Sequence, residues 1–129
     1  MENKKINSFT DLNSWKEGHK LVLIVYKITK EFPKEELFGL VMQLRRAVVS
    51  VTSNIAEGFS RNSYKEKLQF YSMALGSLTE VQNQIFIAKD INYISDECFN
   101  EVNFQIIVAS KLLNGFIKKT KFIIQDSKS

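Results

Sequence analysis

The chain has 129 residues, of which 44% are hydrophobic and 25% are charged, a composition typical of one globular domain large enough to bury a core. One proline and five glycines argue against a loop-rich all-β fold, and a lone cysteine, Cys98, excludes an internal disulfide. The net charge of +4 is mildly basic, which permits an anionic partner such as nucleic acid without requiring one.

Nothing in the sequence indicates a targeting or membrane segment. The N-terminus, MENKKINSFT, has no apolar core of the kind that a signal peptide needs. The longest apolar run, LVLIV at 21–25, is far too short to cross a bilayer. A lone cysteine also suits a reducing compartment. We therefore expect a cytoplasmic protein with no membrane partner.

The first helix is predicted at 11–31, after a flexible N-terminal segment at 1–10. Its apolar positions recur at spacings of three and four, as one helix face requires: Leu12, Trp15, His19, Val22 and Tyr26. The sequence FPKEE at 32–36 ends this helix and begins the next, because proline suits a first helical position and acidic residues complement the positive end of a helix.

The second helix is predicted at 34–59, with a natural stop near Gly58. Its run VVSVT at 48–52 has the β-branched content of a strand, but three- and four-residue spacing continues on both sides and favours a helix. On a helical projection Phe38 falls within the apolar arc. The central apolar stripe of this helix consists of Leu37, Val41, Leu44, Val48, Val51 and Ile55.

The third helix is predicted at 63–91, with Ser63 as its N-cap and Glu66 completing a capping box, and the fourth at 95–121. The remaining tail, 122–129, is expected to fray. Short connections between four helices favour antiparallel neighbours. The predicted fold is therefore all-α, an up-down-up-down antiparallel four-helix bundle formed by 11–121.

Catalytic chemistry finds little support in the sequence. With one histidine and one cysteine, His19 and Cys98, the chain lacks the paired Glu-x-x-His motifs of di-iron bundles and any zinc-ligand cluster. No glycine-rich phosphate loop is present. His19 and Cys98 both fall on apolar stripes and are interpreted as core residues. We expect no enzyme activity, no metal and no cofactor.

Arg45 lies inside the apolar arc of the second helix. A guanidinium placed there is expected to be at least partly buried and to pair with a carboxylate, with Glu66 or Glu80 of the third helix as candidates. The alternative is that its stem lies along apolar surface while its charged head reaches water.

Two polar stripes predict a second packing surface. One on the second helix is compact and free of lysine, and a matching one on the third helix has heptad spacing. They predict contact with another copy of the chain, although such stripes also occur on solvated faces. Their members are Gln43, Arg46, Ser50, Ser53, Asn54, Glu57 and Arg61 on the second helix, and Glu66, Phe70, Met73, Ser77, Glu80 and Gln84 on the third.

Basic residues gather in two segments, Arg45–Lys67 and Lys111 to the end of the chain. These are candidate contacts for the phosphates of RNA or DNA. The alternative is that the lysines only solvate the surface. The candidate nucleic-acid contacts are Arg46, Arg61, Lys65, Lys67, Lys118, Lys119 and Lys121.

Residues 9 to 121 resemble the four-helix-bundle proteins encoded in intervening sequences of bacterial 23S rRNA genes, a family often labelled as ribosomal protein S23. The most specific matches are QLRRA at 43–47, NIAEG at 54–58, Arg61-x-Ser63 with Glu66, and ALGSLTE at 74–80; Trp15 and FPKEE also fit. The sequence Val51-Thr52-Ser53 departs from a segment that often contains proline in the family.

The resemblance implies a left-handed up-down bundle that assembles as a ring-like homopentamer, with no established enzyme activity. It also suggests kinship with the accessory protein of diversity-generating retroelements, a pentamer that engages a reverse transcriptase and nucleic acid. The positions that carry the family pattern are Gln43, Arg45, Arg46, Asn54, Glu57, Gly58, Arg61, Glu66, Ser77 and Glu80.

Two functions remain open at this point. One is an RNA-associated homo-oligomer, in which repetition around a ring multiplies a modest basic patch. The other is a protein-interaction scaffold, in which Arg46 and Arg61 are occupied by Glu57, Glu66 or Glu80 of the same or a neighbouring copy and bind no nucleic acid.

Overall fold

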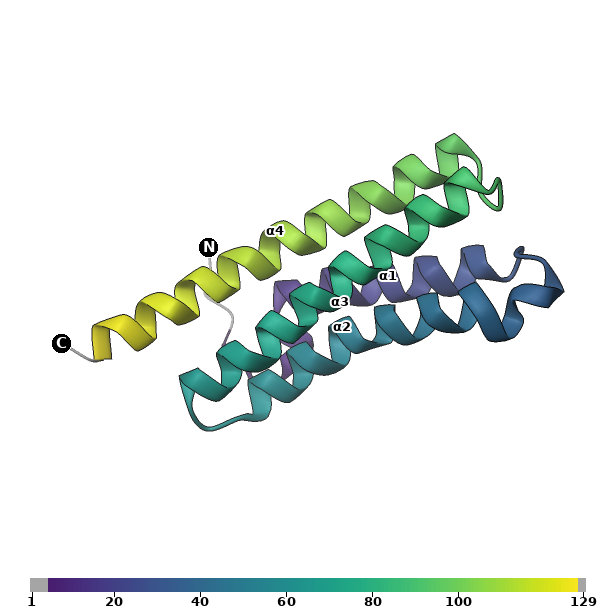
Figure 1. The fold of residues 1–129 in the computed structure, drawn as a ribbon. Coiled ribbons are helices and arrows are strands. Elements are labelled where there is room, and N and C mark those ends of the chain that lie inside the picture. Colours follow the sequence, from purple (N-terminus) through teal and green to yellow (C-terminus); the bar gives the residue numbers. More distant parts are fainter. Residues whose placement is uncertain (1–4, 128–129) are drawn as a thin grey trace.

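Four α-helices form an antiparallel bundle in the computed structural model, which describes residues 5–127. They run alternately up and down, and α1 contacts α2, α2 contacts α3, α3 contacts α4 and α4 contacts α1 (Figure 1). The predicted all-α four-helix bundle is confirmed. The helices are α1 (Asn13–Thr29), α2 (Met42–Ser60), α3 (Tyr64–Asp90) and α4 (Asp96–Ser127), with short helical turns η1 (Phe9–Asp11), η2 (Lys34–Glu36) and η3 (Leu37–Val41).

The core is built from one apolar stripe of each helix. On α2 the predicted stripe is buried from Val41 to Ile55, and VVSVT is helical as predicted. Aliphatic side chains dominate the interior, so the four stripes together account for most of the favourable burial. The largest fully buried side chains are Tyr71, Leu21, Leu44, Ile55, Leu78, Ile85, Ile106, Leu113, Val25, Val48, Val51 and Val81.

The face that α1 buries differs from the predicted one. Leu21 and Val25 are fully buried, whereas Tyr26, expected on the apolar stripe, is 38% exposed. The inward face includes Gly18, where an added Cβ would lie 3.2 Å from Thr52 Cγ2 of α2. Small residues on the inward face let α1 approach α2 closely, and an apolar periodicity does not register them.

The start of the second helical region is broken where the sequence predicted a continuous helix from 34. The 3-10 turn η2 is followed by the π turn η3, inside which Gly39 has φ −110° and ψ −113°. A π turn holds an extra residue and rotates the side chains before it relative to α2. Phe38, predicted in the apolar arc, is consequently 81% exposed.

One carboxylate ties this irregular segment to the opposite pair of helices. Glu36 Oε1 accepts a hydrogen bond from Leu40 N at 3.1 Å, and Glu36 Oε2 accepts one from Tyr93 Oη, in the α3–α4 connection, at 2.7 Å. The Tyr93 hydroxyl and then the Leu40 amide hold the pKa of Glu36 below its ordinary value of 4.5. The fold therefore stabilises the ionised form of Glu36.

Acidification is expected to destabilise the wild-type protein more than the Glu36→Gln variant. Because the folded-state pKa of Glu36 is lowered, its contribution is present above the unfolded-state pKa and is lost as the pH falls through the folded-state value. Glutamine keeps an oxygen acceptor but does not titrate. Urea denaturation at pH 7 and at successively lower pH, with Glu35→Gln as control, measures the difference, and an equal loss in wild type and Glu36→Gln would contradict the assignment.

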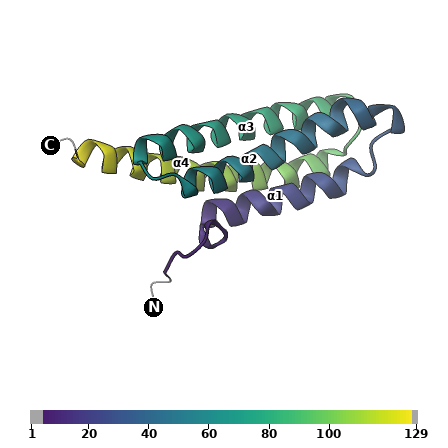
Figure 2. The same cartoon turned by 90° about the horizontal axis from the view of Figure 1, so that it is seen from below.

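Helix ends follow the prediction at α3 but not at α4. Ser63 Oγ accepts from Glu66 N at 3.1 Å, as expected of an N-cap, but the Glu66 carboxylate does not accept from Ser63 N, so the predicted capping box is only half formed. The tail predicted to fray from 122 is instead helical through Ser127, so α4 projects past the α2–α3 turn (Figures 1 and 2). At the other terminus, within the segment predicted as flexible, η1 has a capping box between Ser8 and Asp11. Residues 1–4 and 128–129 lie outside the described range.

Candidate nucleic-acid and assembly surfaces

Arg45 faces α1 rather than α3. It is half-buried, its Nε donates to Thr29 Oγ1 at 3.0 Å, and its guanidinium carbon lies 4.6 Å from the centre of the Tyr26 ring. The expected ion pair with Glu66 or Glu80 is therefore wrong: within residues 5–127 no carboxylate pairs with Arg45. Neutral oxygens and an aromatic face stabilise the guanidinium here.

Part of the polar stripe joins α2 to α3 inside one copy. Ser50 Oγ and Ser77 Oγ lie 2.9 Å apart, and Asn54 Nδ2 donates to Ser50 O at 2.8 Å and to Ser50 Oγ at 3.0 Å. All three residues are half-buried, so these small polar groups allow close approach of the two helices. The members of the two stripes that remain exposed are Gln43, Arg46, Ser53, Glu57, Arg61, Glu66, Met73 and Glu80.

An apolar groove borders Arg46 at the start of α2. The groove holds about 470 Å³, and Arg46 Nη2 donates to Gln43 Oε1 at 2.8 Å on its edge. Phe38 and Met42 line it and are 81% and 47% exposed. Contiguous exposed apolar side chains are typical of protein contact surfaces. We call this surface, lined by Tyr26, Leu37, Phe38, Val41, Met42, Arg45, Arg46 and Val49, the α2 groove.

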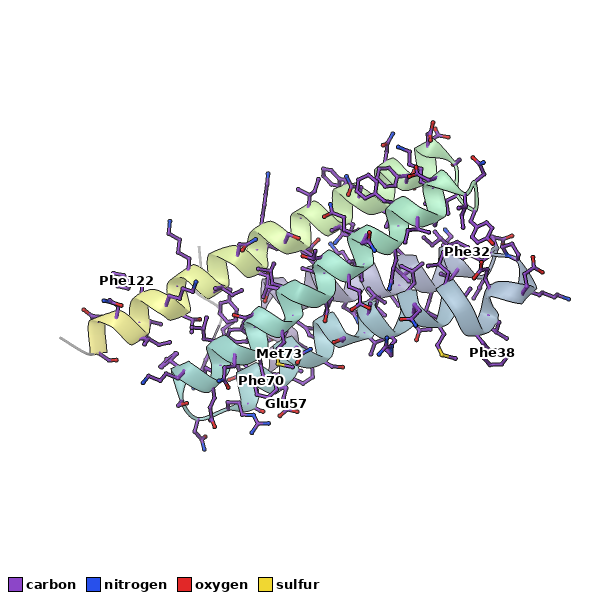
Figure 3. All side chains as sticks on the ribbon, in the orientation of Figure 1. Phe32, Phe38, Glu57, Phe70, Met73 and Phe122 are labelled. Carbon is purple, nitrogen blue, oxygen red and sulfur yellow. The ribbon has the colours of Figure 1, made fainter. Side chains whose placement is uncertain are left out.

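Arg61, the C-cap residue of α2, contacts one side chain of α2 and one of α3. Its Nη2 lies 3.1 Å from Glu57 Oε2, and its guanidinium carbon lies 4.7 Å from the centre of the Phe70 ring. Both charged side chains remain substantially exposed, so this pair adds little to stability. Figure 3 shows Glu57, Phe70 and Met73 near one another by the α2–α3 turn.

Lys67 caps the end of α2. Its Nζ donates to Phe59 O at 2.7 Å and lies 3.4 Å from Gly58 O, so it satisfies carbonyls that the helix leaves unpaired. Burial lowers the pKa of its ammonium group. Lys67 thus has a structural role in addition to its predicted role as a nucleic-acid contact.

Basic residues from two distant segments meet at one end of the bundle. The exposed lysines at 118, 119 and 121 lie on the C-terminal part of α4, and Lys119 lines a cavity of about 270 Å³ together with Lys67 of α3. Arg46 lies near the other end of α2 and is not part of this group. We call the basic end the set Arg61, Lys65, Lys67, Lys118, Lys119 and Lys121.

The remaining titratable groups form no recognisable catalytic site. Among residues 5–127, no three His, Cys, Asp or Glu side chains could together hold a metal ion. His19 is half-buried and stacks on Trp15 with ring centres 4.6 Å apart. Burial and then Glu101 raise the pKa of the half-buried Cys98 thiol, which disfavours its reactive thiolate. None of the helices within 5–127 has the length and apolarity to span a bilayer.

Two functional features escaped sequence reasoning. The α2 groove depends on the π turn, which no periodicity indicates. Lys111 lies eight residues before Lys119 on α4 and lines a second cavity with it; it begins the predicted basic segment but is not among the contacts named individually. The signal that could have found it is the spacing of Lys111, Gly115 and Lys119, which places all three on one helix face.

Comparisons with known proteins agree with this architecture. Residues 10–115 match the family model described as 23S rRNA-intervening sequence protein. A comparison with curated proteins finds no match. The fold is similar to a crystal structure of a protein of unknown function from the S23 ribosomal protein family of Bacteroides thetaiotaomicron, with a TM-score of 0.76 and 21% identity over 81% of this chain and 95% of that chain. Because the family match covers most of the sequence, this chain belongs to the 23S rRNA-intervening sequence protein family.

Proposed function

We propose that this protein is a non-enzymatic, cytoplasmic homo-oligomer, a ring of five copies, that binds RNA through the basic end of each copy. The observation that carries the proposal is the convergence of the segments 61–67 and 118–121 at one end of the bundle, where Lys67 and Lys119 line a common cavity. Aromatic side chains, Phe59 and Tyr64, line the same cavity. Lysines interleaved with aromatic rings suit phosphates and bases of a single strand.

The charge distribution along α4 supports binding at this end. Its first turns carry Asp96, Glu97 and Glu101, whereas Lys118, Lys119 and Lys121 lie toward its C-terminal end, with Asp126 as the one acidic residue after them in the helix. An anionic polymer is therefore attracted to one end of the bundle and repelled from the other. One copy offers few phosphate contacts, but several copies held together engage a strand at once, which raises the overall affinity.

Assembly is supported by the α2 groove. Its exposed apolar side chains Phe38 and Met42 lie beside Arg46, and such a surface gains stability when a second copy covers it. The second function, an interaction scaffold without nucleic acid, is favoured by the contacts that already occupy Arg61 and Lys67.

The double variant Lys118→Glu, Lys121→Glu is expected to weaken binding to a labelled single-stranded RNA by about tenfold or more at low salt, because two phosphate contacts are replaced by repulsion. The slope of log K against log salt should become shallower by about 1.4, since each single-strand contact accounts for about 0.7. Fluorescence anisotropy over a salt series measures the affinity and its salt dependence. Light scattering reports whether the variant keeps the oligomeric mass of the wild type.

A matched control carries the same charge change elsewhere. Lys27→Glu with Lys34→Glu alters exposed lysines near the α1–α2 connection and should affect RNA binding much less. The assignment of the basic end would be contradicted if the two double variants lost RNA affinity equally, or if RNA affinity did not depend on salt concentration. An intact oligomer that binds no RNA even at low salt would favour the scaffold.

A further inference from the structure

A cavity of about 470 Å³ lies between the first turn of α1 and the outer face of α4. Its polar lining comes from Asp11 of η1, from Asn13 and Ser14 of α1 and from Lys111 and Lys119 of α4, and Gly115 lies between the two lysines. The rest of the lining is largely apolar. Two helices thus contribute donors and positive charges to one concave surface.

The start of α1 lacks a side-chain cap. The residue at its N-cap is Leu12, which makes no side-chain hydrogen bond to the helix. The first backbone bond of the helix is donated by Lys16 N to Leu12 O at 3.0 Å, so the amides of Asn13, Ser14 and Trp15 precede it. Such amides, together with the helix dipole, favour an anion.

Ser14 supplies a second and independent indication. It is only 6% exposed, and its Oγ has no hydrogen-bond partner within the described part of the chain. A buried hydroxyl without a partner costs stability, so its presence in the wall of a cavity points to a ligand oxygen that accepts a hydrogen bond from it.

The α4 wall is built to leave room for such a ligand. Lys111, Gly115 and Lys119 follow one another at four-residue spacing on one face of the helix. An added Cβ on Gly115 would meet no heavy atom within 4 Å, so no packing contact requires glycine there. Glycine in the middle of a helix lowers its stability, and here it keeps the space between the lysines open.

One carboxylate also lines the cavity, but it is engaged. Asp11 Oδ2 accepts hydrogen bonds from Asn7 N at 3.0 Å and from Ser8 N at 3.1 Å in the capping box of η1. These two amides offset part of the negative charge. The lysines, the helix dipole and the Ser14 hydroxyl therefore make the site prefer an anion over a cation.

We propose that this cavity binds a phosphate group, with the first amides of α1 and the Ser14 hydroxyl donating to its oxygens and Lys111 and Lys119 neutralising its charge. The cavity adjoins the one at the basic end, since Lys119 and Phe116 line both. A backbone phosphate of the RNA proposed above reaches it along that shared wall. Only this source of the phosphate rests on the proposed function.

The test uses the full-length protein and inorganic phosphate as the probe. Trp15, the single tryptophan of the chain, follows Ser14 directly and reports binding by its fluorescence, and the amide signals of Asn13 and Ser14 report it by NMR. We expect a saturable change in both. Ser14→Ala should weaken phosphate binding about fivefold, the loss of one neutral hydrogen bond. Lys119→Gln should weaken it about tenfold, the loss of one charged contact.

Two further results separate binding from folding. Ser14→Ala should leave the urea midpoint unchanged or raised, because it removes an unpartnered buried hydroxyl. Lys27→Gln, an exposed lysine near the α1–α2 connection that does not line the cavity, should bind phosphate as the wild type does. Absence of a saturable response, or equal phosphate affinity in wild type, Ser14→Ala and Lys119→Gln, would overturn the site.

A single-stranded RNA decamer distinguishes the sources of phosphate. If the decamer competes with inorganic phosphate at Trp15, the site binds the RNA backbone. If phosphate binds and the decamer neither binds nor competes, the site stands as one for free phosphate or small phosphorylated compounds, and the proposed RNA function fails. If the decamer binds at the basic end while phosphate never alters Trp15, the site fails and the RNA function stands.

Discussion

The Gly58→Ala variant is expected to lose about 2 kcal/mol of unfolding free energy, although alanine is the better helix former. An added Cβ would lie 2.6 Å from Tyr71 Cε1 and 3.0 Å from Phe70 Cβ. Tyr71 is 1% exposed, so its ring cannot swing aside without displacing the core. The methyl group would push α3 away from α2. Urea denaturation followed by circular dichroism, at one fixed protein concentration, measures the loss.

A second glycine provides the control. Gly76 lies in the middle of α3, and an added Cβ there meets no heavy atom within 4 Å. Gly76→Ala should therefore stabilise the protein by about 0.5–1 kcal/mol, the ordinary gain in helix propensity. If the two alanine variants proved equally stable, the close α2–α3 packing described here would be wrong.

Phe32→Ala is expected to destabilise the fold by about 3–4 kcal/mol, as truncation of a buried aromatic side chain does. Phe32 is 6% exposed, and its ring centre lies 5.4 Å from that of Tyr93, in the α3–α4 connection. It closes the end of the core where α1 stops. Removal leaves a cavity beneath Tyr93, which thermal or chemical denaturation would detect.

Phe38→Ala is the matched change, six residues further along. Its ring points away from the bundle (Figure 3), so unfolding free energy within each copy should change by no more than about 0.5 kcal/mol. Light scattering should instead show weaker self-association, because Phe38 lines the α2 groove. Leu23 is an exposed leucine that does not line the groove, so Leu23→Ala is the control. If the Phe38→Ala oligomer were as stable as the Leu23→Ala oligomer, assembly through the α2 groove would be contradicted.

Much of the fold was predictable because periodic apolar residues decide it. The stripe from Val41 to Ile55 placed α2 correctly even through its β-branched run, since helical spacing on both sides outweighs a local strand propensity. The face of α1 was misjudged because its buried positions include Ser14 and Gly18, where small size matters more than hydropathy. The break at Gly39 depends on hydrogen bonds from Leu40 and Tyr93 to Glu36, and the Tyr93 contact is long-range.

The candidate site was predictable in composition but not in contacts. Charge clustering identified the lysines at 118, 119 and 121, because an exposed helix face leaves them free of packing. It could not show that Lys67 caps α2, since that bond depends on where the α2–α3 turn places the ammonium group. Arg45 was expected near α3 because the projection fixes an angle around α2 but not which neighbour occupies that angle.

In the proposed ring, the lysines near the end of α4 would link RNA binding to assembly through electrostatic repulsion. If the copies of that ring point the same way, the lysines at 118, 119 and 121 of all copies would lie along one rim. Added salt screens this repulsion and favours the ring, whereas the same salt weakens the hold on RNA. On this proposal a bound strand would neutralise the rim, so RNA and subunits would promote each other's binding, and linkage requires the effect to be mutual.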